Sequence, residues 1–220
     1  NIKPNMKKNL SYIISIMFVP ILFVFMIWIV EGLEYILDEN FSTFGIIPLE
    51  YKRIYGILSY PFIHSDLNHL LNNTYPILIL GGIISEVYKK ISVKVFFYSY
   101  IISGLLLWVF GPRDTTIIGA SGTVYALGSF ILFSGFIRKQ PRLMILSFLV
   151  IFLNFFNLWG IIEIQQDNIS QTAHLCGVIA GIITSVLLKN EGPQPKIYDY
   201  EIEEELEKKN KINYIYKKKN

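Results

Sequence analysis

The chain has 220 residues, 52% of them hydrophobic and 15% aromatic, and its mean hydropathy is +0.43. This composition is rich for a soluble domain, and the apolar residues are clustered in stretches of membrane-spanning length, which takes roughly 20 residues. The formal net charge is +3, and the only cysteine is Cys176, which excludes an internal disulfide. We expect no nucleic-acid partner.

Six apolar stretches predict six membrane-spanning helices. They cover about residues 11–30, 67–85, 94–110, 117–137, 143–161 and 170–188. The first is long enough to span a bilayer and lacks a small-residue cleavage site, so we expect a helix there and not a cleaved signal peptide. The predicted fold class is therefore an all-α membrane protein with a six-helix bundle.

The placement of charged residues tests this count. If the N-terminus is cytosolic, the cytosolic connections hold nine basic residues, namely Lys3, Lys7, Lys8, Lys89, Lys90, Lys94, Arg138, Lys139 and Arg142. The opposite side holds three, which are Lys52, Arg53 and Arg113. The acids there are Glu31, Glu34, Asp38, Glu39, Glu50, Asp66, Asp114, Glu163 and Asp167. This positive-inside bias predicts a cell-membrane protein whose N-terminus and lysine-rich C-terminal tail are both cytosolic.

Outside the helices, two segments stand out. The connection of about residues 31–66 is too long for a turn, and Pro48 and Pro61 argue against one continuous helix there. The final segment is strongly charged and is expected to be a solvated cytosolic tail. We therefore divide the chain into a cytosolic N-terminus (1–9), a membrane domain (10–189) and a charged tail (190–220).

Polar side chains open the second predicted helix. His64 lies near its start, and a structural role is the simpler interpretation. His69 and Asn73 are four residues apart and share one helix face. Both donate hydrogen bonds, as a developing oxyanion requires, but His and Asn also link helices to one another within membranes.

The fourth predicted helix carries Gly119-Ala-Ser121-Gly122. Small residues let helices approach closely, so close packing is one interpretation of this motif. A serine hydroxyl is also a potential nucleophile when a base lies beside it. Tyr125 lies one turn from Ser121 on the same face, where its ring can pack against whatever approaches the serine.

The sixth predicted helix carries a stripe of small residues, Ala173, Gly177 and Gly181, which indicates a helix-packing face. His174 lies about 100° around the helix from this stripe, at the edge of the expected contact. Cys176 points elsewhere and is expected to be an apolar filler.

A common depth links these residues. In the topology given by the charges, His69, Ser121 and His174 each follow the outer start of their helix by a few residues. All three are then expected roughly 5–10 Å below the outer surface, given the rise of a helix. One site that opens to the extracytosolic side accounts for this shared depth.

The chain resembles the rhomboid intramembrane serine proteases over about residues 10–188. The resemblance rests on three ordered motifs, H-x4-H-x3-N at 64–73, G-A-S-G at 119–122 and A-H-x2-G-x3-G at 173–181. The six-helix bundle with a long first extracytosolic loop also matches the bacterial rhomboid architecture. The motif residues expected to support the site are His64, Gly119 and Gly122.

Transferred residue by residue, the resemblance implies that Ser121 is the nucleophile and His174 its general base. His69, Asn73 and the Ser121 backbone N–H would form the oxyanion hole, and Tyr125 would pack against the His174 ring. No acidic third member is apparent, so we expect a dyad without metal or cofactor. The expected substrates are single- or multi-span membrane proteins within the lipid bilayer.

The first loop departs from the family pattern. Many rhomboids place Trp-Arg about a dozen residues before the oxyanion histidine, where this chain reads Tyr55-Gly56-Ile57. The stretch resembles a bacterial subgroup with a Gly-Ile pattern, and we expect this loop to seat differently.

Other classes of membrane protein fit less well. An inactive rhomboid-like protein that binds membrane clients would usually lack the serine or the base, and both are present. A small transporter would show an internal repeat or deep charges, which the spans lack. A zinc protease needs His-Glu-x-x-His, and an aspartyl protease needs two carboxylates within the spans.

Overall fold

The computed structural model describes residues 6–141, 143–146 and 168–193, and within them the chain is helical. The long helices are α1 (Met6–Leu37), α3 (Leu67–Val87), α4 (Ser92–Phe110), α5 (Ser121–Ile137) and α8 (Asn168–Leu187). Short helical turns connect α1 to α3, namely η1 (Phe41–Phe44), η2 (Tyr51–Arg53), α2 (Gly56–Ser59) and η3 (Tyr60–Phe62). The all-helical prediction is confirmed for these residues.

Three helical segments are long and apolar enough to cross a membrane, and they are Ile16–Leu37, Leu67–Val87 and Ser92–Phe110. Two shorter apolar helices, Ser121–Ile137 and Gln171–Leu187, coincide with the fourth and sixth predicted spans. The predicted span at 143–161 falls outside the described residues except for 143–146. The tail beyond Pro193 and residues 1–5 also lie outside them.

Two helices differ most from the sequence prediction in their bounds, and α1 differs at both ends because it already begins at Met6. α1 continues to Leu37, past the acidic Glu31. The carboxylate of Glu31 ends the apolar run from which the span was predicted, but glutamate and leucine are both good helix formers, so the helix itself continues. α5 begins only at Ser121, because Ile117 pairs with the first loop and Gly119 has a φ of +101°, which no right-handed helix accommodates.

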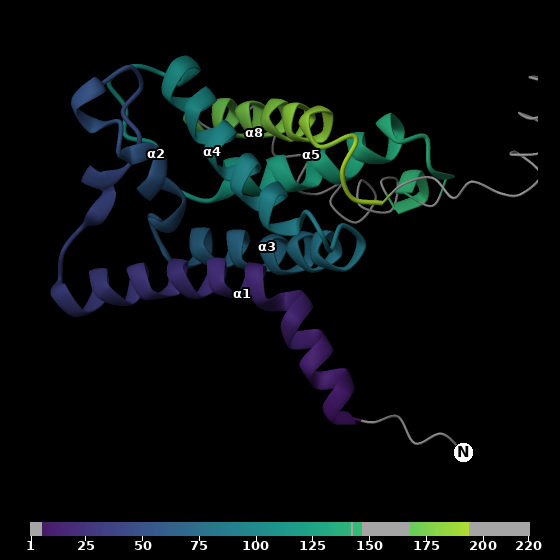
Figure 1. Ribbon diagram of the computed structural model, residues 1–220. Coiled ribbons are helices and arrows are strands. Elements are labelled where there is room, and N and C mark those ends of the chain that lie inside the picture. The colour runs from purple at the N-terminus through teal and green to yellow at the C-terminus, as the bar shows by residue number, and fades with distance from the viewer. Residues whose placement is uncertain (1–5, 142, 147–167, 194–220) are drawn as a thin grey trace, which may run out of the picture.

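The helices pack in two groups that meet along the bundle (Figure 1). α1 lies on α3, while α8 packs mainly against α5 and α4. α1 and α3 approach closely where Pro20 faces Gly81, and Trp28 Nε1 donates a hydrogen bond of 3.2 Å to Thr74 Oγ1. The loop between α1 and α3 lies at the end of the bundle where α5 and α8 begin (Figure 1).

Two buried clusters form the interior. The larger joins α3, α4 and α5 through residues such as Leu80, Leu127 and Phe130. The smaller joins the first loop to α4 and α8, and Cys176 is buried within it, as expected for an apolar filler. The first loop is therefore part of the packed fold.

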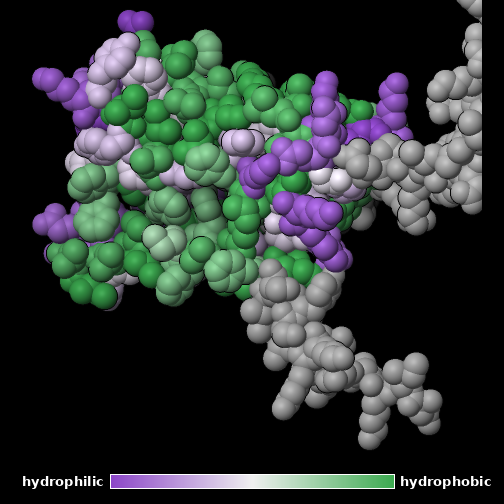
Figure 2. All heavy atoms as spheres, viewed as in Figure 1, coloured by the Kyte–Doolittle hydropathy of each residue, from purple (hydrophilic) through white to green (hydrophobic). Residues whose placement is uncertain are grey.

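The outward surface is strongly apolar. Figure 2 shows hydrophobic residues over the middle of the visible face and hydrophilic residues toward its two ends. Large apolar side chains are exposed on α1, α3 and α4, including Phe25, Ile79 and Phe97. An exposed surface rich in large apolar side chains is typical of a protein whose sides contact lipid.

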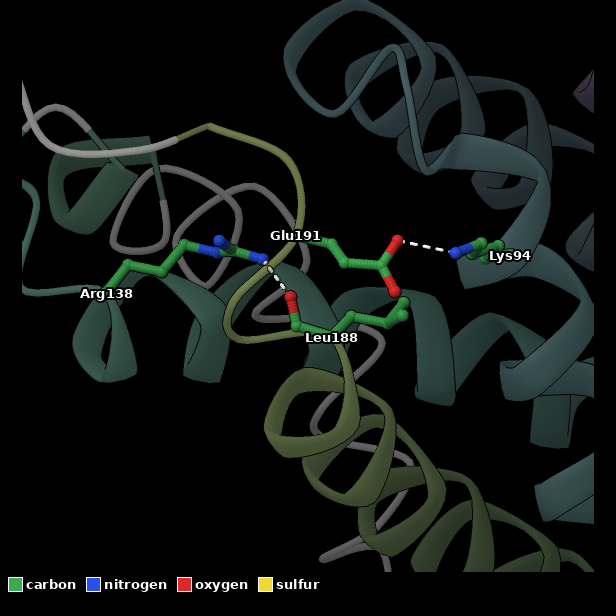
Figure 3. Close-up of polar contacts among 4 residues, drawn as sticks. All are labelled: Lys94, Arg138, Leu188 and Glu191. Carbon is green, nitrogen blue, oxygen red and sulfur yellow. Dashed lines mark hydrogen bonds and ion pairs between the residues drawn. The ribbon is translucent and has the colours of Figure 1, made fainter.

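The far end of α8 is fixed by a buried cation (Figure 3). Arg138 donates from Nη2 to the Leu188 carbonyl at 2.7 Å and from Nη1 to the Lys189 carbonyl at 2.9 Å. These are carbonyls that the end of a helix leaves without an intrahelical partner. An ion pair of 2.6 Å between Lys94 and Glu191 lies beside them. The start of the segment predicted as a tail thus contacts the helical domain.

Candidate active site

The turn before α5 is held by the first loop. Ile46 and Ile117 exchange two backbone hydrogen bonds of 2.9 and 2.8 Å, and the Gly119 N–H donates to the Tyr60 carbonyl at 2.8 Å. Gly119 then adopts a left-handed φ of +101°, which favours glycine. Ser121 follows as the first residue of α5, so its position depends on this turn.

His69 lies directly against this turn. A Cβ atom added to Gly119 would lie 2.6 Å from both Cε1 and Nε2 of His69, closer than real Cβ contacts allow. The ring therefore occupies the space that the missing side chain leaves. The structure thus brings together two residues that the sequence separates by about fifty positions.

Asn73 lies one turn further along α3 and is buried. Its Nδ2 donates a hydrogen bond of 3.0 Å to the carbonyl of His69 within the same helix. This contact orients the amide on the His69 face of α3. The interaction of Asn73 seen here is therefore within α3, which differs from the interhelical link that was the alternative interpretation.

His174 is buried and stacks on Tyr125, with 4.0 Å between ring centroids and an interplanar angle of 25°. This is the ring contact that the resemblance implied. Ser121 is four residues before Tyr125 on α5 and so shares its face. The helical spacing therefore places Ser121 one turn from the ring on which His174 is stacked.

The small-residue stripe of α8 faces α5, as predicted. A Cβ on Gly177 would collide with the Gly122 carbonyl, and one on Gly181 would lie 2.6 Å from Ser129 Cβ. A Cβ on Gly122 would lie 3.5 Å from the Ala173 carbonyl oxygen. This close approach of the two backbones fixes the position of His174 relative to α5.

His64 is closer to the site than its position in the sequence suggested. Its Nε2 accepts a long hydrogen bond of 3.5 Å from the Ala120 N–H, and its ring lies edge-on to His69 with 4.9 Å between centroids. Burial, together with the nearby His69, lowers the pKa of His64 to about 3, so the ring is neutral near pH 7. A neutral ring matches its use as an acceptor.

Tyr60 is a supporting residue that the sequence analysis missed. Its carbonyl binds Gly119, and its buried hydroxyl lies 2.8 Å from Ser103 Oγ of α4 and 3.4 Å from Thr123 Oγ1 of α5. Burial raises the pKa of this phenol, which therefore remains a hydrogen-bond donor. A tyrosine in a loop carries no sequence signal for such a role.

The Gly-Ile pair of the first loop is also part of this support. Gly56 lies so close to Gly45 that a Cβ would collide with the Gly45 carbonyl, and Ile57 is buried in the smaller cluster. A Cβ on Gly45 would itself lie 2.6 Å from the Ile117 carbonyl oxygen. The loop thus seats on the turn before α5 through small residues and backbone contacts.

Asp66 and Ser65 were not predicted as site residues either. Asp66 caps α3 by accepting the His69 N–H at 2.9 Å, and an acidic residue just before an apolar helix is a recognisable N-cap signal. No group of three or more His, Cys, Asp or Glu side chains is placed to hold a metal ion in the part of the chain that the structure describes.

The Rhomboid domain model matches residues 51–191, which span the second half of the first loop and, among the described helices, α3, α4, α5 and α8. Because this match covers more than half of the chain, the protein belongs to the rhomboid family. Together with its apolar helices, this membership makes it a membrane protein.

Similar proteins come from bacteria and a plant. An uncharacterized protein of Mycobacterium tuberculosis is 27% identical over 175 residues, which cover 76% of this chain and 72% of the relative. An uncharacterized protein of Mycobacterium leprae is 28% identical over 176 residues, covering 76% and 68%. Rhomboid-like protein 11, chloroplastic, of Arabidopsis thaliana is 25% identical over 180 residues, covering 70% and 61%.

Proposed function

We propose that this rhomboid-family protein is an intramembrane serine endopeptidase that cleaves transmembrane helices of other membrane proteins. Ser121 is the nucleophile and His174 the general base. The stacking of His174 on Tyr125, one helical turn from Ser121, is the observation that carries this proposal. It supports a base held beside the serine.

The proposed chemistry needs only these two side chains. Ser121 Oγ attacks the scissile carbonyl carbon while the neutral His174 imidazole takes the hydroxyl proton. The resulting imidazolium then gives that proton to the leaving amine, and an acyl-enzyme remains. Water deprotonated by His174 cleaves the ester and restores both residues. A dyad of this kind lacks the carboxylate that orients the base in a triad, and the Tyr125 stack takes over that orientation.

The oxyanion is stabilised by hydrogen-bond donors from α3 and from the first residue of α5. His69, Asn73 and the Ser121 N–H are the proposed oxyanion hole. Two contacts support this assignment, because the His69 ring lies against Gly119 and Asn73 is tied to the His69 carbonyl. Donors fixed before the reaction begins stabilise the charge that develops in the transition state.

We propose that the substrates reach this site from the lipid bilayer and that the site opens to the extracytosolic side. Ser121 is the first residue of α5, and His69 is in the first turn of α3, so both lie at the end of the bundle that carries the first loop. Arg138 lies at the opposite end of α5. The six-span bundle, with cytosolic segments at 1–9 and 190–220 around a membrane domain at 10–189, completes this topology.

Reconstitution in liposomes with a panel of single-span substrates tests the proposal. The intact protein should cleave at least one substrate and react with a fluorophosphonate probe, and Ser121→Ala should do neither. Ser129→Ala is the matched control, because this serine lies on the same helix and bonds to the Val178 carbonyl. Cleavage that persists in purified Ser121→Ala would refute the mechanism. Substrate binding without cleavage by the intact protein would indicate an inactive, client-binding member of the family.

A further inference from the structure

The Nδ1 side of His69 lies in a small polar cluster at the start of α3. Ser65 Oγ lies 2.8 Å from Asp66 Oδ2 and 3.2 Å from His69 Nδ1. The other oxygen of the same carboxylate, Asp66 Oδ1, accepts the backbone N–H of His69 at 2.9 Å. The serine hydroxyl thus stands between a carboxylate and an imidazole nitrogen.

The single proton of the Ser65 hydroxyl can serve only one of these two neighbours. The bond from the His69 N–H, together with the one from Ser65, lowers the pKa of Asp66, so this carboxyl is ionised near pH 7. An ionised carboxylate only accepts hydrogen bonds. Ser65 therefore donates to Asp66, and its oxygen is left to accept a hydrogen bond from Nδ1–H of His69.

This arrangement determines what the other nitrogen of His69 can do. A neutral imidazole carries one proton, and if that proton is on Nδ1, then Nε2 has a lone pair and cannot donate. Yet Nε2 is one of the two ring atoms that lie against Gly119, in the turn directly before Ser121. A donor at this position then requires protons on both nitrogens.

We propose that Ser65 and Asp66 are positioning residues that hold a proton on Nδ1 of His69, so that His69 donates from Nε2 to the oxyanion as an imidazolium. The donation from Nε2 to the oxyanion rests on the proposed proteolytic function. The placement of the Nδ1 proton rests on the geometry around Ser65 and on the ionised carboxylate of Asp66.

The groups around His69 act on a cation there in opposite directions. Partial burial of the ring disfavours the charged form, and the negative charge of Asp66 offsets part of that cost; Glu31 of α1 is within electrostatic reach of Asp66. His64 lies edge-on to His69 but is neutral above pH 5, because burial lowers its pKa to about 3. The turn before α5 presents Gly119, which does not titrate.

Nitrogen NMR of the full chain in detergent tests the proton placement without any substrate. The sequence contains three histidines, so ¹⁵N-histidine labelling gives few signals, and His69→Gln identifies those of His69. In the pH range where His69 is neutral, we expect Nδ1 to be protonated and Nε2 to be bare. A neutral His69 with its proton on Nε2 in the intact protein would overturn the proposal.

Variants of the cluster sharpen this test. Ser65→Ala removes the acceptor, and Asp66→Asn frees the Ser65 proton for Nδ1, so both should move the proton of neutral His69 to Nε2. Asparagine caps helices about as well as aspartate, so Asp66→Asn should fold. Ser65→Thr keeps the hydroxyl and should behave like the intact protein. Asn68→Ala, an exposed neighbour, is the matched control and should leave the signals unchanged.

The pH dependence of cleavage is the second readout. If the cation is the competent form, kcat/KM should fall as pH rises through the His69 pKa measured by NMR. In Ser65→Ala this alkaline loss should disappear, because a neutral His69 then carries its proton on Nε2. An unchanged alkaline loss in Ser65→Ala would refute the link to the oxyanion. An intact protein that shows the expected NMR signals but cleaves nothing would instead refute the proposed function.

Discussion

Replacing Gly119 with alanine tests the contact between the turn before α5 and the His69 ring. The new Cβ would lie 2.6 Å from Cε1 and Nε2 of His69, so the ring must retreat by about 0.8 Å to reach an ordinary contact of 3.4 Å. A displacement near 1 Å costs catalysis up to about 100-fold. We therefore expect turnover to fall by about 10²-fold, and the left-handed φ at this residue should cost roughly 1–3 kcal/mol of stability.

Initial cleavage rates in liposomes and thermal unfolding in detergent, measured on the same preparations, separate these two effects. Gly128→Ala is the matched control, because its Cβ would meet Leu80 Cδ1 at an ordinary 3.7 Å in the interior of α5. That control should keep its turnover and gain about 0.5–1 kcal/mol of stability.

The two residues should also be coupled. If Gly119→Ala acts by displacing His69, it should cost little additional turnover in a His69→Ala background. A folded Gly119→Ala protein with full turnover would refute the placement of His69 against the turn. Equal losses in both backgrounds would show that the turn acts independently of His69.

Three further predictions concern other parts of the molecule. Asn73→Ala should lower kcat by up to about 10²–10³ with little change in KM or thermal stability, whereas loss of stability with intact kcat would refute an oxyanion role. Arg138→Ala should destabilise the fold by roughly 2–4 kcal/mol, because it removes charged hydrogen bonds to the end of α8. Lys139→Ala is the control and should not destabilise the fold; equal melting temperatures of the two variants would contradict this prediction. In a Cys176→Ser background, a cysteine at Arg113 should react with a membrane-impermeant reagent from outside and one at Lys90 should not, and the reverse pattern would invert the topology.

The sequence by itself predicted the positions of the long helices that the structure describes and supplied the candidate site residues. Runs of apolar residues predicted the positions of α3, α4, α5 and α8, because a helix in a membrane needs an unbroken apolar segment. The spacing of His69 and Asn73, and of Ser121 and Tyr125, placed each pair on one helix face. These are local properties, which helical geometry fixes without reference to the rest of the chain.

The relations between distant segments were decided only by the tertiary structure. Nothing in the sequence indicates that Tyr60 binds Gly119, that Ile46 pairs with Ile117, or that His64 reaches Ala120. These contacts depend on the path of an irregular loop, which no periodic pattern records. The start of α5 at Ser121 follows from the same contacts, because apolar content continues through residues 117–120 while the backbone there turns into the first loop.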